Sequence, residues 1–209
     1  MDIERLIPRS TLANQAWPAY VLDAAGKIFH VNAAWDREAC NSAGLLGRQV
    51  IGTAWLDHIA GDEVRAWHRE LLDRLLHPPD GASRGRMNHV CACNTAERFR
   101  IFSTHFDRLM LPGEDGVAGV LVTSSLLGEA PIDARYLVAS FDERRLRQPD
   151  GTMLQCSGCR RMSVAGSSPR VWEFVPKLVW HPRPDISHGI CALCREVYYG
   201  TTERYRLEP

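Results

Sequence analysis

The clearest pattern of apolar and polar positions predicts a long helix in the first half of the chain. Five apolar residues recur at helical spacing among charged neighbours: Val64, Trp67, Leu71, Leu72 and Leu75. Residues at this spacing share one face of a helix, which can be buried against a core. The pattern begins at Gly61 or Asp62 and ends at Leu76, and a Pro-Pro-Asp-Gly run then stops the helix. We therefore expect an amphipathic helix over residues 62–76.

Shorter apolar runs on either side of this helix predict β-strands. Residues 19–23 and 27–31 flank an Ala-Ala-Gly turn and form a predicted hairpin, after which Asn32 can cap a helix over 33–40. Three further strands are predicted over 86–94, 97–109 and 117–126. This order of elements predicts an α+β fold, in which a five-stranded antiparallel sheet carries helices on one face.

The composition changes near residue 152, where two Cys-x-x-Cys pairs follow. The four cysteines are Cys156, Cys159, Cys191 and Cys194. Four thiolates suit a closed tetrahedral zinc site with Zn–S distances of about 2.3 Å. A segment this short is too small to be held by an apolar core alone, so metal binding would supply folding energy. The pattern predicts a zinc-ribbon-like module over residues 152–209, and an iron–sulfur cluster on the same thiolates is the alternative.

Three polar residues near the cysteine pairs are candidates for supporting the ion. Arg160 and Arg195 each follow a pair directly and would offset part of the negative charge of four thiolates. His188 lies three residues before Cys191. We expect it to support the site rather than to bind the metal, because four sulfurs already complete a tetrahedron.

The first half of the chain resembles PAS sensory domains over residues 15–127. The residues that carry the resemblance are Pro18-Ala19-Tyr20-Val21-Leu22-Asp23, Gly26-Lys27-Ile28, Val31-Asn32-Ala33-Ala34-Trp35 and Gly44-Leu45-Leu46-Gly47-Arg48. The resemblance implies a PAS-like fold with a small-molecule pocket between sheet and helices, often in a dimer. Residues 1–14 would form a lead-in, and residues 128–151 a partly helical linker. The cysteine segment, with Ser-His-Gly-Ile-Cys at 187–191, resembles a short module that ends some bacterial PAS and receiver-domain signalling proteins.

Six residues of the PAS-like segment are candidates for lining its ligand pocket: Trp35, Trp55, Trp67, His68, His89 and Cys91. Tryptophans at such positions more often fill a core than bind a cofactor. His68 lies on the long predicted helix, where haem-binding PAS proteins can place an axial ligand. The resemblance therefore leaves haem open as an alternative cofactor.

Composition and charge narrow the classes of function. Lys plus Arg and Asp plus Glu are equal at 25 each, which argues against a general attraction to nucleic acid or to a membrane surface. The first residues lack the pattern of a secretory signal, and no apolar run is long enough to span a membrane, so we expect a cytoplasmic protein. No nucleophile–base pair, phosphate-binding glycine loop or paired carboxylates indicates an enzyme.

These features together predict a cytoplasmic signal-sensing protein. A PAS-like domain would bind a small ligand or form a homodimer, and a zinc module would contact a partner signalling protein. Two alternatives stay open. One is a redox or gas sensor that carries an iron–sulfur cluster or haem. The other is a DNA-binding regulator that uses the basic residues Arg144, Arg145, Arg160 and Arg161.

Overall fold

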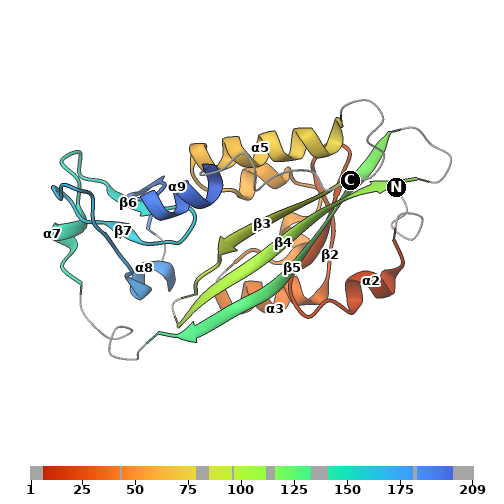
Figure 1. Cartoon of the computed structure of the whole chain (residues 1–209). Coiled ribbons are helices and arrows are strands. Elements are labelled where there is room, and N and C mark those ends of the chain that lie inside the picture. The colour runs from red at the N-terminus through yellow and green to blue at the C-terminus, as the bar shows by residue number, and fades with distance from the viewer. Residues whose placement is uncertain are drawn as a thin grey trace.

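The computed structural model describes residues 7–42, 44–78, 85–95, 97–111, 116–132, 141–180 and 183–199. The described residues up to 132 form a sheet domain, and those from 141 onward form a smaller cysteine module at one end of the sheet (Figure 1). Parts of the predicted lead-in (1–6), linker (133–140) and C-terminal segment (200–209) lie outside the described residues. No described helix has the length and apolar content needed to cross a membrane.

The sheet domain confirms the predicted α+β fold with a five-stranded antiparallel sheet. The strands lie in the order β2-β1-β5-β4-β3. Their bounds are β1 Ala19–Asp23, β2 Ile28–Val31, β3 Arg86–Ala92, β4 Arg98–Met110 and β5 Val117–Pro131. Strand β5 continues past residue 127 to Pro131, which still pairs with Arg98. The side chains of this extension are largely exposed, so the apolar alternation that predicts a strand is absent there.

The helices that follow β2 cover one face of the sheet, as predicted. They are α3 (Ala33–Ser42), α4 (Gly47–Val50), the 3-10 turn η1 (Trp55–His58) and α5 (Asp62–Leu76). Helix α5 has the predicted bounds, and its five periodic apolar residues are buried. Asn32 caps α3 as expected, because its side-chain Oδ1 accepts the backbone N–H of Trp35 at 3.1 Å and that of Ala19 at 3.0 Å.

The described residues 7–14 of the lead-in cover part of the opposite face of the sheet. The short helix α2 (Arg9–Ala13) places Leu12 beside Ile7 in a cluster on the strand residues Ala19, Val21, Leu109 and Leu121. These residues alternate with Leu22, Val120 and Val122, which face α5 in the main core and are fully buried. Helix α2 therefore lies on the face that α3 to α5 leave open.

The cysteine module contains a small mixed sheet with the strand order β8-β7-β6-β9. Its elements are β6 Met153–Cys156, β7 Met162–Ser163, β8 Trp172–Glu173, α8 Pro176–Trp180, β9 Ile186–Gly189 and α9 Ala192–Tyr199. Strands β6 and β9 are parallel. A core of five residues holds the module together: Leu146, Met153, Met162, Val175 and Leu178.

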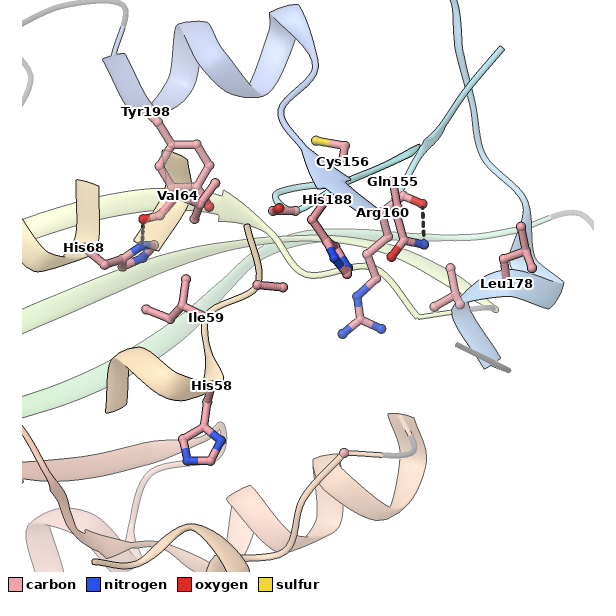
Figure 2. Close-up of a pocket in the computed structure, with 14 residues that line it drawn as sticks. His58, Ile59, Val64, His68, Gln155, Cys156, Arg160, Leu178, His188 and Tyr198 are labelled. Carbon is pink, nitrogen blue, oxygen red and sulfur yellow. Dashed lines mark hydrogen bonds between the residues drawn. The ribbon is translucent and has the colours of Figure 1, made fainter. Parts of the chain in front are cut away.

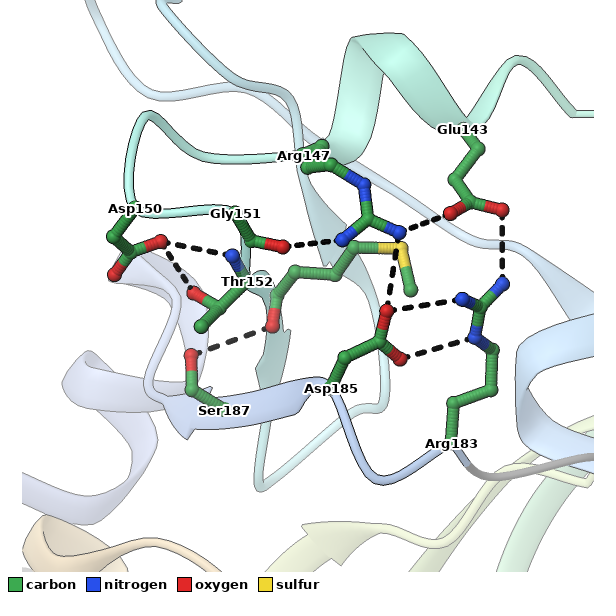
Figure 3. Close-up of polar contacts among 9 residues, drawn as sticks. Glu143, Arg147, Asp150, Gly151, Thr152, Arg183, Asp185 and Ser187 are labelled. Atoms are coloured by element: carbon green, nitrogen blue, oxygen red, sulfur yellow. Dashed lines mark hydrogen bonds and ion pairs between the residues drawn. The ribbon is translucent and has the colours of Figure 1, made fainter.

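The described part of the predicted linker is attached to this module. It contains helix α7 (Glu143–Leu146), and Leu146 is 2% exposed in the core of the module. Arg147 and Arg183 each bridge Glu143 and Asp185, which joins α7 to the start of β9 (Figure 3). The hydrogen bonds from Arg147 and Arg183 lower the pKa of Glu143. This half of the linker is therefore partly helical and tied to the residues that follow it.

Candidate metal centre and its junction with the sheet domain

The parallel pairing of β6 and β9 brings the two Cys-x-x-Cys pairs to the same end of the small sheet. Cys156, the last residue of β6, is paired with Gly189, the last residue of β9. Cys156 is also the first cysteine of the first pair, and Cys191, the first cysteine of the second pair, lies two residues after the end of β9. Parallel strands end at the same edge, so both pairs converge although they are distant in sequence.

The four predicted cysteines form one compact, buried cluster. Their Sγ atoms all lie within 4.8 Å of one another, and each residue is buried. The Sγ atoms of Cys159 and Cys191 are 3.8 Å apart. A regular tetrahedron with Zn–S bonds of about 2.3 Å has S–S edges of about 3.8 Å. A disulfide would need about 2.05 Å, and all four cysteines are free. The donor set and its spacing therefore fit a single tetrahedral ion.

Backbone N–H groups point at the sulfurs. The N–H of Cys191 donates to Cys156 Sγ at 3.3 Å, and the N–H of Cys194 donates to Cys191 Sγ at 3.4 Å. Both pairs make the same turn, in which the N–H of Arg160 bonds to the Cys156 carbonyl and that of Arg195 bonds to the Cys191 carbonyl. Such bonds favour the thiolate, which is the form that binds a metal.

The thiols strongly perturb one another. Hydrogen bonding from Cys159, and then from Cys191, holds the pKa of the Cys156 thiol far below its usual range. The same contact with Cys156 raises the pKa of Cys159. Like charges this close cannot all ionise together unless a cation lies between them. A divalent ion would remove this conflict, because it binds all four thiolates with release of their protons.

Helix α9 connects the cluster to α5 of the sheet domain (Figure 1). It carries Cys194 in its first turn, and Tyr198 one turn later is 6% exposed. The Tyr198 ring packs on Trp67 at a centroid distance of 5.3 Å and on His89 at 4.7 Å. Helix α9 therefore joins the cysteine cluster to residues of the sheet domain.

Three polar contacts reinforce this junction. Arg195 pairs with Glu63 at 3.0 Å, and the Tyr199 hydroxyl donates to the Glu63 carbonyl. Asn94, which is buried two residues after the end of β3, donates its side-chain amide to the Cys159 carbonyl at 3.0 Å. The cysteine module and the sheet domain are thus held together by both apolar and polar contacts.

The predicted supporting residues occupy different places around the cluster. Arg195 is paired with Glu63 of the sheet domain. Arg160 adopts a left-handed backbone conformation with φ +61°. His188 is exposed and outside the group of four sulfurs. Both Arg160 and His188 line a cavity beside the cluster (Figure 2).

The cavity has a volume of about 420 Å³ and lies between the sheet domain and the cysteine module. The sheet domain contributes residues from η1 and α5 to its lining, and the cysteine module contributes residues from β6, α8, β9 and α9. Of the six residues predicted to line a ligand pocket, His68 lines this one. The rings of Trp67 and His89 pack against Tyr198, which also lines the cavity. The centroid of the Trp55 ring lies 5.3 Å from that of the His68 ring.

The other two predicted pocket residues belong to the interior of the sheet domain. Trp35 packs edge-on against Tyr20 at 5.3 Å, and its indole N–H donates to the Leu45 carbonyl. Cys91 lies on β3, 4.0 Å from the Thr104 hydroxyl, and burial raises the pKa of its thiol to about 11. A thiol in this state is inert at neutral pH.

Burial keeps the two histidines at the junction neutral. It lowers the pKa of His68 to about 4, and it lowers that of His89 to about 3, with a further effect from His68. His68 Nδ1 is 2.8 Å from the Val64 carbonyl, so this nitrogen carries the proton. Two neutral imidazoles can pack on aromatic rings without the cost of a buried charge.

Comparison with known proteins adds only weak similarity to solved structures. No protein-family model matches the sequence, and no curated protein matches it. Among solved structures, the chain is similar to the Drosophila melanogaster Cycle PAS-B domain with bound ethylene glycol, with 12% sequence identity and a TM-score of 0.36. The match covers 53% of this chain and 99% of that chain. Its identity and TM-score are too low to assign a family, a ligand or a partner.

Sequence reasoning missed the residues that join the two parts. Tyr198, Glu63 and Asn94 make this junction, and none stands in a motif. One signal was present for Tyr198, because it lies four residues after Cys194 and so shares a helical face with a cysteine of the cluster. Nothing comparable marks Asn94, whose partner is 65 residues away.

Proposed function

We propose that this chain is a regulatory protein in which a structural metal centre holds a partner-binding module against a PAS-like sensory domain. The observation that carries the proposal is the buried cluster of Cys156, Cys159, Cys191 and Cys194, with all Sγ atoms within 4.8 Å. The bound ion would fold the module, because a segment this small has a limited apolar core. We expect no enzymatic role and a cytoplasmic location.

Zinc suits the cluster better than the iron–sulfur alternative. An iron–sulfur cluster places several iron and sulfide atoms between its cysteines, so the thiolates must stand further apart than around one ion. The 3.8 Å separation of Cys159 and Cys191 Sγ matches the edge of a tetrahedron around one ion. Four protein ligands also leave no open coordination position, which is typical of structural zinc.

The junction offers a physical route for regulation. A ligand or partner that binds one arrangement of the two parts more tightly shifts the population toward it. Helix α9 bears a metal ligand, Cys194, and contacts α5 through Tyr198 and Arg195. A change in the docking of α5 would therefore alter the surface that the module presents to its partner.

The test is metal analysis of the full chain purified without oxygen or added cofactors, together with its visible spectrum. We expect a colourless protein with one zinc per chain, and Cys156→Ser or Cys191→Ser should lose the metal. Cys93→Ser is the matched control, because Cys93 is an exposed free cysteine outside the cluster. Iron with sulfide and visible absorbance would support the redox alternative, and a metal-free, folded chain would refute both.

The haem alternative at His68 has its own test. A Soret band that appears on adding haem, and is lost in His68→Ala, would move the proposed function to a haem sensor.

Hydrogen exchange tests the regulation that we propose, which is coupling between the metal centre and α5. Removing the metal should reduce protection in α5 as well as in α9, and unchanged protection in α5 would contradict coupling between the two parts.

A further inference from the structure

The cavity at the junction has the electrostatic character of an anion site. Fourteen residues line it, and the set contains Arg160, three histidines and no aspartate or glutamate. Arg160 carries a permanent positive charge in this lining, and the thiol of Cys156, the other ionisable group close to it, belongs to the cysteine cluster. A concave site with a cation and without carboxylates concentrates negative ligands.

The turn of the first cysteine pair directs Arg160 into this cavity. Its left-handed backbone (φ +61°) is held by the bond from its own N–H to the Cys156 carbonyl. Figure 2 shows its guanidinium beside the His188 imidazole in the open space, while the sulfur of Cys156 points away. Within the described part of the chain, the Arg160 guanidinium makes no ion pair or hydrogen bond, and only the backbone carbonyl of Arg160 accepts one, from Gln155.

A second polar group in the lining also has no protein partner. The Ser157 hydroxyl is buried and makes no hydrogen bond with the described residues. His188 lies next to Arg160 on the neighbouring strand β9 and offers a further ring nitrogen. Buried polar groups are normally satisfied by protein, water or ligand. The Ser157 hydroxyl, the Arg160 guanidinium and the His188 ring therefore form a polar part of the cavity that is suited to an oxyanion.

The rest of the lining is apolar. Ile59 and Val64 come from the sheet domain, Leu178 and Val179 come from α8, and Tyr198 adds an aromatic ring. Cavities of about 300–1,000 Å³ with apolar walls and a few convergent polar groups are typical of small-ligand sites. A free inorganic anion would leave these walls without a partner, whereas an organic acid would contact both the polar groups and the apolar walls.

We propose that the junction cavity binds a small organic carboxylate, with its carboxylate on Arg160, His188 and Ser157 and its apolar body against Ile59 and Val64. Because both parts of the chain line the site, the ligand would bridge them. This inference deepens the proposed function by naming the ligand class that controls docking of the metal module. It places that site at the junction rather than inside the sheet domain.

The test is calorimetric titration of the metal-loaded full chain with benzoate, benzamide and inorganic phosphate. We expect one benzoate per chain, and at least tenfold weaker binding of both benzamide and phosphate. Arg160→Gln should weaken benzoate binding at least tenfold, which corresponds to about 1.4 kcal/mol. Arg161→Gln is the matched control, since it removes the same charge from the next residue, which does not line the cavity. It should leave binding unchanged.

A second measurement maps the site without any variant. In spectra of the histidine ring protons, benzoate should shift the signal of His188 and leave that of His105, on β4, in place. Equal binding of benzoate and benzamide, equal effects of the two arginine variants, or a shift at His105 without one at His188 would each overturn the inference. Metal content is measured in every sample. Failure of the metal centre is therefore seen separately from failure of the ligand site.

Discussion

Replacing Tyr198 with alanine should destabilise the sheet domain as well as the cysteine module. The Tyr198 ring is 6% exposed and lies between the two parts, in contact with Trp67, His89 and His68. It belongs to the module by sequence and to the main apolar core by its contacts. These contacts tie the unfolding of the two parts together.

The expected loss follows from the size and burial of the ring. Removing a buried large aromatic side chain costs about 3–5 kcal/mol, which includes the cavity left behind. Aromatic pairs such as Tyr198–Trp67, at 5.3 Å and 73°, contribute about 0.5–1.5 kcal/mol of this. A domain of this size is stable by about 5–15 kcal/mol. We therefore expect Tyr198→Ala to lose a large part of the free energy of unfolding, about 3–5 kcal/mol, and to unfold at a clearly lower urea concentration.

The assay follows urea unfolding of the metal-loaded chain with two probes. Metal release reports on the module, and hydrogen exchange in α5 and β3 reports on the sheet domain. Leu193→Ala is the matched control, because Leu193 lies on the same helix but is 62% exposed. It should cost less than about 0.5 kcal/mol.

One result would refute this reasoning. If Tyr198→Ala advances metal release and leaves exchange in α5 and β3 unchanged, the two parts unfold independently. A double-mutant cycle with Trp67→Ala gives a second check. A coupling energy near zero would show that the two rings do not stabilise each other.

Three further predictions concern the same junction. Gly61→Ala should destabilise the chain by more than Gly52→Ala. Both glycines have a positive φ (+84° and +88°), but a Cβ at Gly61 would lie 2.1 Å from Ser157 Oγ, whereas one at Gly52 would meet nothing within 4 Å. Equal costs in urea unfolding would contradict the contact between Gly61 and Ser157. Glu63→Gln should cost less than about 1 kcal/mol, because its ion pair with Arg195 is exposed, and a larger loss in the same assay would contradict this. Burial lowers the pKa of His68 to about 4 and that of His89 to about 3, so the unfolded state binds more protons than the folded state. The contribution of these histidines to the free energy of unfolding is then complete above about pH 6.5. It falls by about 2 kcal/mol per histidine from about pH 7 to 5. His89→Gln should flatten that profile at constant metal content, and an unchanged slope would contradict it.

Periodicity and spacing predicted those parts of the structure that local sequence determines. The bounds of α5 followed from a 3.6-residue repeat, because burial of one face requires it. The cysteine cluster followed from two Cys-x-x-Cys pairs, since each turn presents two sulfurs to one point. The last part of β5 was missed because its exposed side chains carry no alternation, and backbone pairing with β4 alone extends the strand.

The junction could not be predicted for a different reason. Its contacts join residues that are far apart in the chain, such as Arg195 and Glu63, which are 132 residues apart. No local pattern encodes which surfaces of two folded parts are complementary. The sequence placed Trp67 and His89 at a pocket within one domain, whereas in the structure both contact Tyr198 of the other part.

The length of α9 explains why metal and sheet domain should be coupled. The helix has only 8 residues, and isolated helices shorter than about 12–15 residues are marginal in water. It therefore depends on its anchors, which are Cys191 and Cys194 at the metal-binding end and Tyr198 one turn later. Cys194 and Tyr198 are four residues apart and share one face. Release of the metal would remove the first anchor, and the remaining contact would have to hold the helix alone. Loss of the ion should therefore weaken the packing of Tyr198 on Trp67. Helix α5 would then be destabilised although it does not contact the metal.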